Sequence, residues 1–137
     1  MMSQENVEIV RRAFEAVRRK PTPDFDTINV LYHSDHEFVS LIQRIEGGVA
    51  MGSQGYRDWI AENDESWTNW DFEFDRVESI DSDRVLVATN FAGVSKRGGV
   101  PVEQATAVIV TVRDGKIART VIYDSVEDAL EAGGVSE

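Results

Sequence analysis

The hydrophobic period of the chain changes near Trp70, and this change restricts the fold more than any other feature. Before that point, apolar residues recur every three to four positions, as Val7, Val10 and Phe14 do, which is typical of amphipathic helices. After it, apolar and polar residues alternate, as in strands with one buried face. A chain with its helices first and its neighbouring strands afterwards is expected to form an α+β protein, with the helices gathered on one face of a sheet.

Three helices are predicted in the first half of the chain. Pro21 ends the first helix, and Asp24 can cap the second. A strand is expected at residues 36–42, and residues 46–52 read as a loop that serves either as a lid or as a plain surface connection. The helices are predicted at residues 4–19, 24–33 and 53–67.

Short turns divide the second half of the chain into four antiparallel strands. Asp114 and Gly115 lie between two β-branched runs, which is a strong signal for a tight hairpin. The alternation slips near Asp75, which predicts a β-bulge, and Ser125 can cap a short closing helix. The strands are predicted at residues 72–80, 84–95, 102–113 and 116–124.

A single domain is expected to cover residues 1–137, because this length is ordinary for one core and no linker or repeat is present. The formal net charge of −11 repels phosphate backbones and anionic lipids, so neither nucleic-acid nor membrane binding is expected. The absence of cysteine excludes disulfides and thiol chemistry. A cytoplasmic location is expected, since the sequence shows no signal peptide and no apolar run of about 20 residues.

Five strings carry a family resemblance, and they stand at residues 6–16, 31–38, 52–59, 112–117 and 123–133. In order and spacing they are similar to strings of the SnoaL-like family, within the nuclear transport factor 2-like superfamily. The resemblance implies a cone-shaped (cystatin-like) α+β roll. Three N-terminal helices would pack on a curved, mostly antiparallel sheet, with a short C-terminal helix, and would enclose an apolar cavity. Dimers on the convex sheet face are common in such proteins, so a homodimer is expected.

The family includes polyketide cyclases, steroid isomerases, epoxide hydrolases, dehydratases and non-catalytic modules, so the resemblance implies a pocket without fixing a reaction. A steroid-isomerase-like site would have a tyrosine near Phe14, an aspartate near Ser40 and a protonated acid near Thr106 or Ala107. Relatives often carry a histidine near Val108. Because this sequence has none of these groups, the resemblance favours binding over proton-transfer chemistry.

His36 and Asp124 are the candidate catalytic residues. His36 shares strand parity with Phe38 and Ser40, which by resemblance face the cavity, and a neutral histidine can act as a general base near pH 7. Asp124 ends the last strand on its expected cavity side, where an apolar surrounding can adapt a carboxyl group to acid or base chemistry. The alternative for Asp124 is a structural place in the cap of the closing helix.

Further residues are expected to contact a ligand in the cavity. Asn90 and Gln104, on adjacent strands, either bind a ligand or bond to each other across the strands. Tyr56 and Trp59 lie along one side of the third helix, where they form either an aromatic pocket wall or plain core. The ligand-binding candidates are Phe14, Phe38, Ser40, Tyr56, Trp59, Asn90, Gln104, Thr120 and Ile122.

His33, Asp35, His36 and Glu37 form the densest group of potential metal ligands. Successive side chains on a strand point to opposite faces, so these four are not expected to converge, and no metal or other cofactor is predicted. Three functions remain open. The favoured one is a domain that binds a small apolar molecule. The others are a lyase, isomerase, cyclase or hydrolase that uses acid–base chemistry in the same cavity, and a dimerisation module without a ligand.

Overall fold

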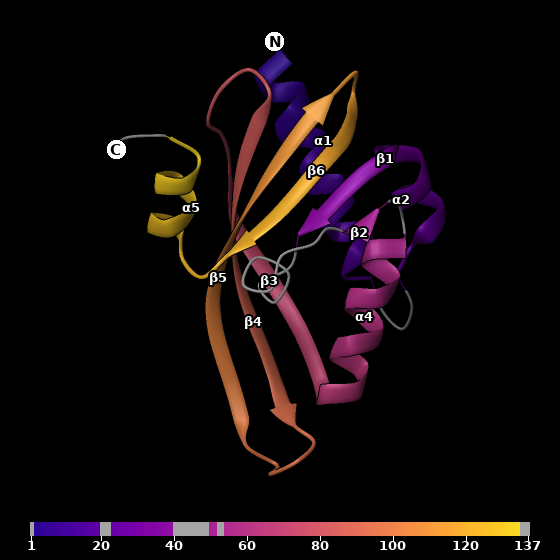
Figure 1. Ribbon diagram of the computed structural model, residues 1–137, viewed down its shortest axis with the longest axis vertical. Coiled ribbons are helices and arrows are strands. Elements are labelled where there is room, and N and C mark those ends of the chain that lie inside the picture. Colours follow the sequence, from indigo (N-terminus) through magenta and orange to yellow (C-terminus); the bar gives the residue numbers. More distant parts are fainter. Residues whose placement is uncertain (1, 20–22, 40–49, 52–53, 135–137) are drawn as a thin grey trace.

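Helices come first and most of the strands follow, as the change of hydrophobic period predicts (Figure 1). The computed structural model describes residues 2–19, 23–39, 50–51 and 54–134. No helix in this part of the chain is long and apolar enough to cross a membrane. The elements are α1 (Met2–Val17), α2 (Phe25–Leu31), β1 (Tyr32–Val39), β2 (Ala50–Met51), α4 (Gln54–Ser66), β3 (Trp67–Ser79), β4 (Arg84–Ser95), β5 (Pro101–Arg113), β6 (Lys116–Tyr123) and α5 (Val126–Ala132).

The strands of the described residues form one sheet in the order β2-β1-β6-β5-β4-β3. Neighbouring strands pair antiparallel, except β1 and β6, which run parallel. The sheet is twisted, with α1, α2 and α4 on one side of it and the short α5 on the other (Figure 1). The structure therefore confirms the predicted α+β class: in the described part of the chain, α1, α2 and α4 pack on a mostly antiparallel sheet and a short helix follows the last strand.

Alternation along the central strands divides the core into two layers. Val85, Val87 and Val110 are fully buried in the layer that faces α1. Leu86 is also fully buried, but it packs in the other layer with Leu130 of α5. Burying each such side chain contributes about 1.5–3 kcal/mol. A one-residue slip would exchange the two faces of a strand, so this packing fixes the register.

The predicted caps and the predicted hairpin are confirmed. The Asp24 carboxylate accepts a hydrogen bond from the Thr27 backbone N–H at 3.2 Å, and the Ser125 hydroxyl accepts one from the Asp128 N–H at 3.1 Å. Asp114 and Gly115 have φ angles of 54° and 74°. Two successive positive φ values are those of a type I′ turn, whose twist matches the flanking strands.

Long-range strand pairing moves two element boundaries away from their predicted positions. Trp67, expected at the end of a helix, is the first residue of β3 and pairs with Ser95. β1 begins at Tyr32, four residues before the predicted start, because Tyr32 pairs with Ile117 of β6. The hydrophobic pattern of one segment carries no information on the strand with which it pairs, so it misplaces the ends of these elements.

The stretch predicted as a loop also contains a short strand. Ala50 and Met51 form β2 and pair with Phe38 and Glu37 of β1. Other parts of the prediction fall on residues 40–49 and 52–53, which lie outside the described residues. They include the end of the strand predicted at 36–42, Ser40, and the glycines of the proposed lid.

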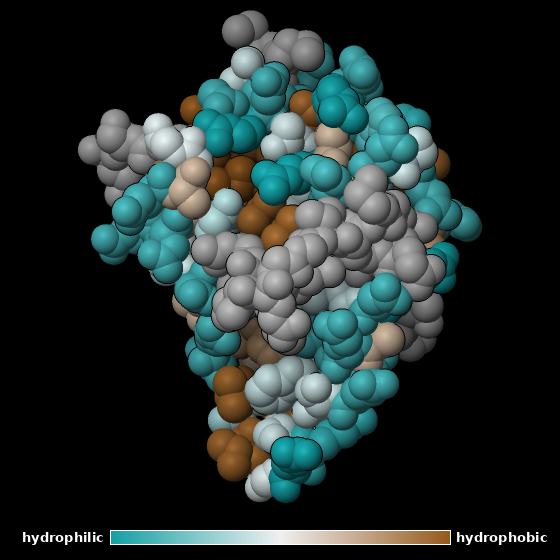
Figure 2. All heavy atoms as spheres, in the orientation of Figure 1, coloured by the Kyte–Doolittle hydropathy of each residue, from teal (hydrophilic) through white to brown (hydrophobic). Residues whose placement is uncertain are grey.

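The face of the molecule drawn in Figure 2 is largely hydrophilic, as expected for a chain with 25 acidic residues. Apolar side chains gather at the lower end, over the hairpin that joins β4 and β5. Val100 lies in this hairpin and is 56% exposed. Its exposure is that of a loop tip, since single exposed apolar residues are common on protein surfaces.

Candidate ligand-binding cavity

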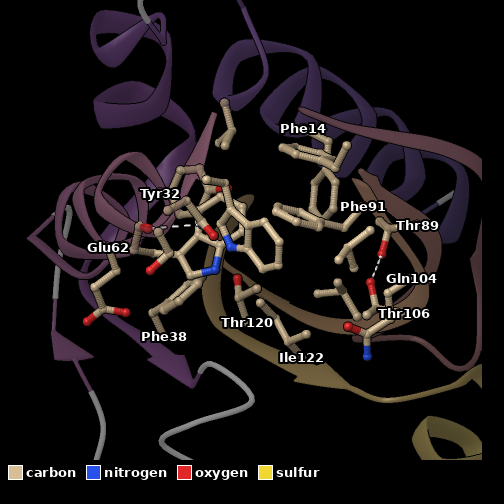
Figure 3. Close-up of a pocket in the computed structure, with 18 residues that line it drawn as sticks. Phe14, Tyr32, Phe38, Glu62, Thr89, Phe91, Gln104, Thr106, Thr120 and Ile122 are labelled. Atoms are coloured by element: carbon tan, nitrogen blue, oxygen red, sulfur yellow. Dashed lines mark hydrogen bonds between the residues drawn. The ribbon is translucent and has the colours of Figure 1, made fainter. Parts of the chain in front are cut away.

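A cavity of about 320 Å³ lies on the face of the sheet that α1 and α4 cover (Figure 3). Its walls combine aromatic, aliphatic and neutral polar side chains from the helices and strands. The aromatic lining consists of Phe14, Tyr32, Phe38, Trp59, Trp67, Phe72 and Phe91. The remaining described lining consists of Val17, Val102, Val108, Ile122, Glu62, Asn63, Ser66, Thr89, Gln104, Thr106 and Thr120.

The aromatic side chains hold one another in place by edge-to-face packing. The Phe14 ring of α1 meets Phe72 of β3, with centroids 6.2 Å apart and planes at 86°. Trp59 of α4 meets Phe72 edge-to-face at 6.1 Å, and it lies 6.1 Å from Phe38 of β1 with the ring planes tilted by 57°. Such pairs contribute about 0.5–1.5 kcal/mol beyond the burial of area. Four elements thus contribute rings to one continuous aromatic wall.

A bulge in β3 brings two tryptophans to the same face of the strand. Trp67 and Trp70 are three residues apart and would lie on opposite faces of a regular strand. The register shifts between Thr68 and Asp71, and Asn69 adopts a φ of 52°. Both indoles consequently contact the ring of Phe91, at 5.5 Å and 6.0 Å.

The polar groups of the cavity are neutral apart from one carboxylate among the described residues. Thr89 of β4 and Thr106 of β5 are directly paired, and their hydroxyl oxygens lie 2.5 Å apart. Glu62 and Asn63 come from α4, where the Asn63 amide donates to the Trp59 carbonyl at 3.0 Å. In Figure 3, Glu62 lies at one edge of the group and the threonine pair at the other.

His36 is fully buried and lies behind the cavity wall rather than in it. Its Nε2 is 2.9 Å from the hydroxyl oxygen of Thr120, and the Thr120 side chain lines the cavity. The His36 ring also meets the edge of Tyr32 at 4.8 Å and lies 6.5 Å from the Phe38 ring. The histidine that parity directs towards the cavity therefore reaches it through neighbours, chiefly Thr120.

The structure brings most of the ligand-binding candidates together and separates two candidates from them. Asn90 pairs with Ala105 and lies on the opposite face of β4 from Thr89, because successive side chains on a strand point to opposite faces. Asp124 is exposed beyond the end of β6 and does not line the cavity. Ser40 and the side chain of Tyr56 lie outside the described residues. The candidates that line the cavity are Phe14, Phe38, Trp59, Gln104, Thr120 and Ile122.

Sequence reasoning missed several lining residues. Helical periodicity already puts Asn63 on the same side of the third helix as Trp59, although Asn63 was not assigned to the cavity. The same periodicity could have placed Glu62 and Ser66 there. Thr89 could have been found from strand parity once one face of β4 was known to face the helices. Phe91 has the same parity as Thr89 and could have been found with it. Tyr32 needed the tertiary structure, since it was predicted to end a helix.

The family model of the SnoaL-like domain matches residues 10–120 of this chain. The chain belongs to the SnoaL-like family. No curated protein sequence matches the chain significantly.

Solved structures share the fold of this SnoaL-like domain at low sequence identity. A candidate SnoaL-like polyketide cyclase from Jannaschia sp. CCS1 is 15% identical with a TM-score of 0.73, over 99% of this chain and 96% of its own. A hypothetical protein with a ketosteroid isomerase-like fold from Catenulispora acidiphila, in complex with trimethylamine, is 19% identical with a TM-score of 0.68, over 94% of each chain. An LEH-like epoxide hydrolase from M. tuberculosis is 18% identical with a TM-score of 0.65, over 94% of this chain and 84% of its own.

Three of the positions that the resemblance associates with acid–base chemistry lie in the cavity of this SnoaL-like domain, whereas Ala107 is buried in the layer of α5 and Ser40 lies outside the described residues. Phe14, Thr106 and Val108 line the cavity. At these positions the chain presents a ring, a hydroxyl and an aliphatic group, none of which titrates near neutral pH. The described wall of the cavity therefore offers hydrogen bonds and apolar contact.

The carboxyl groups with lowered pKa values lie away from the cavity. Hydrogen bonds from the Arg84 guanidinium lower the pKa of the Asp81 carboxyl, and a hydrogen bond from Arg76 lowers that of Glu78. The Thr27 side chain lowers the pKa of Asp24 in the same way. These shifts come from turns and caps, so they concern stability rather than the site.

The histidines and carboxylates around β1 point in different directions. His36 is buried, Asp35 is exposed, and the Glu37 carboxylate lies 3.4 Å from the Arg119 guanidinium. The His33 Nδ1 accepts a hydrogen bond from the Asp35 backbone N–H at 3.2 Å. Within the described ranges, no group of three histidine or carboxylate side chains is placed to hold a metal ion.

Proposed function

We propose that this SnoaL-like domain binds a small, largely apolar molecule in the aromatic cavity. The cavity itself carries the proposal: about 320 Å³ remains open inside a wall of interlocked rings. Ligand pockets are typically concave, mostly apolar and about 300–1,000 Å³ in volume, with a few polar groups that orient the ligand. Thr120 and the Thr89–Thr106 pair are suited to that orienting role.

The structural relatives support a function that involves small molecules without selecting one. One is described as a candidate polyketide cyclase, one as an epoxide hydrolase, and one was solved with trimethylamine. The same fold thus carries different activities, and the side chains of the cavity decide between them.

Thermal shift measurements with a library of small apolar metabolites test the proposal. A ligand at one hundred times its dissociation constant should stabilise the protein by about 2.7 kcal/mol. The cavity-filling variant Val108→Phe should lose this shift, because Val108 is 5% exposed and lines the cavity. The matched control Val30→Phe should keep it, since Val30 is 66% exposed on α2. A full ligand shift in Val108→Phe would place the binding site elsewhere.

Acid–base catalysis in the same cavity is the second candidate function. It is favoured by one observation, the contact of 2.9 Å between His36 Nε2 and a threonine hydroxyl that lines the cavity. A hydroxyl in this position can pass a proton between a bound molecule and the imidazole. Exchange of a ligand proton for deuterium, followed by NMR, tests this candidate. Exchange should be lost in Thr120→Val, and a ligand that binds without any exchange or conversion leaves the domain a binding module.

Dimerisation without a ligand is the third candidate function, and native mass spectra recorded beside the thermal shifts decide it. We propose a homodimer built on the sheet face opposite the cavity, where Asn90 and Ala105 are paired. A dimer that takes up a library ligand supports binding as the function. A dimer that takes up no ligand would leave association as the function of the domain.

A further inference from the structure

We propose that the ligand carries a cationic amine on an aromatic or otherwise flat apolar body, and that the amine lies at the Glu62 edge of the cavity. This inference rests on the proposed function, because it specifies the class of molecule bound in the same cavity. It is carried by the charges and rings of the lining.

The described lining provides no cation for an anionic ligand. Glu62 is its one charged side chain, and the other polar members are amides and hydroxyls. Nearby basic groups are engaged elsewhere. Lys96 donates to the Asp64 carbonyl, and the Arg18 guanidinium lies 3.4 Å from the Asp71 carboxylate. A carboxylate or phosphate held against the described lining would lose part of its hydration without gaining a counter-ion from that lining, which is unfavourable.

The same lining is suited to a cation. The faces of aromatic rings carry negative charge density and attract ammonium groups, tryptophan most strongly. Trp59 precedes Glu62 by three residues on α4, so the indole and the carboxylate are neighbours on one helix surface. Trp67 lines the cavity just beyond the C-terminal end of that helix. The net charge of −11 also raises the local concentration of cations around the molecule.

The body of the ligand would occupy the remainder of the cavity. Phe14, Phe38 and Phe72 provide apolar ring surface beside Trp59. The Thr89–Thr106 hydroxyl pair lies at the edge away from Glu62 (Figure 3). A molecule with a terminal amine, a flat apolar middle and a neutral hydrogen-bonding group at its far end therefore matches the lining from edge to edge.

Three probes of matched shape test the charge of the ligand: naphthylmethylamine, naphthylmethanol and naphthoate, titrated by isothermal calorimetry at pH 7. The amine should bind about tenfold more tightly than the alcohol, and naphthoate more weakly than either. Glu62→Gln keeps the shape of the side chain and removes its charge. Because Glu62 is exposed, this change should weaken amine binding about threefold to fivefold and leave alcohol binding unchanged. Glu65→Gln, at an exposed position on the same helix outside the lining, is the matched control and should change neither.

The outcomes separate this inference from the proposed function. If the alcohol binds as tightly as the amine, or naphthoate binds best, the cationic class is wrong while the apolar binding site stands. If Glu65→Gln weakens amine binding as much as Glu62→Gln, the effect belongs to the overall field and not to the cavity edge, which also overturns the inference. If none of the three probes binds, the cavity does not accept flat ring compounds of this kind and the inference is overturned, while the proposed function is decided by the thermal shifts over the wider library.

Discussion

At the scale of single residues, the hydrogen bond between His36 and Thr120 joins the buried core to the cavity wall. His36 is fully buried and Thr120 is 2% exposed, so solvent does not compete for this contact. It also connects β1 with β6, the one parallel pair among the described strands. A bond in this position holds the imidazole and orients the hydroxyl that faces the cavity.

Replacing Thr120 should therefore cost more than replacing a threonine at the surface. Thr120→Val keeps the side-chain volume but removes the hydroxyl, leaving the His36 Nε2 without that partner. We expect the free energy of unfolding to fall by about 1–3 kcal/mol, measured by urea denaturation at pH 7. Thr120→Ser retains the hydroxyl, so its free energy of unfolding should fall less than that of Thr120→Val. If Thr120→Val is as stable as the parent, the bond makes no net contribution.

Residue-level predictions succeed in this chain where periodicity is strict, and fail where a partner is needed. Strand parity put Ile122 on the expected cavity side, and it lines the cavity. Phe38, assigned to the cavity by the family resemblance, and Trp59, which helical spacing left as pocket wall or plain core, line it as well. Asn90 was grouped with Gln104 because both are polar and lie on adjacent strands. The register pairs Asn90 with Ala105, one position away from Gln104, so the two amides lie on opposite faces. The sequence shows which strand residues are polar, but the register of the paired strands decides to which face of the sheet each side chain points.

At the scale of elements, β3 and β4 fit together because one glycine leaves room for two indoles. A β-carbon on Gly93 would lie 3.1 Å from the Trp70 β-carbon and 3.3 Å from the Trp67 β-carbon. Neither contact can relax by rotation of a flexible side chain, since both atoms are attached to the backbone. The bulge at Asn69 and the absence of a side chain at Gly93 are therefore two halves of one packing arrangement.

Gly93→Ala should consequently destabilise the protein, although alanine is usually more favourable than glycine inside a strand. The added methyl group must separate β3 from β4 or displace both tryptophans, which we expect to cost about 1–3 kcal/mol. Tryptophan fluorescence should shift at the same time, since Trp67 and Trp70 are two of the three tryptophans in the chain. Gly98→Ala is the control, because its nearest neighbour is a Val100 methyl group at 3.4 Å in an exposed turn. Equal stability of the two variants would contradict this packing argument.

The order and type of most elements could be predicted because the local signals agree with the tertiary contacts. Asp24, Ser125 and the Asp114–Gly115 turn mark ends that the structure confirms. The bulge at Asn69 was not predicted, since an asparagine inside an alternating stretch gives no distinctive local signal. It becomes necessary only when Trp67 and Trp70 must share Phe91 as a partner. The aromatic wall of the cavity is thus a property of paired strands and not of any single segment.

At the scale of the whole molecule, two electrostatic effects act in opposite directions as the pH falls. The net charge of −11 at pH 7 produces self-repulsion in the compact state, which weakens as carboxylates become protonated towards the isoelectric point near 4.6. Hydrogen bonds from Thr27, Arg76 and Arg84 lower the pKa values of three carboxyl groups in the folded state. Carboxyl groups of this kind stabilise the fold above their unfolded pKa values, and that stabilisation is lost as the pH falls through the lowered ones.

The melting temperature should therefore rise slightly from pH 7 to about pH 5 and fall steeply below about pH 4. Differential scanning calorimetry between pH 3 and 8 measures both the rise and the fall of the melting temperature. Added salt should reduce the rise of the melting temperature between pH 7 and pH 5, because it screens repulsion between exposed charges.

Asp81→Asn should lower stability at pH 7, since Asp81 accepts from the Arg84 side chain at 2.8 Å and from two backbone N–H groups. The difference from the parent should begin to shrink below about pH 4, where the aspartate of the unfolded chain becomes protonated, and should vanish once the pH has fallen through the lowered pKa of Asp81 in the folded state. A deficit that stays constant down to pH 3 would mean that Asp81 acts through its shape and not through its charge.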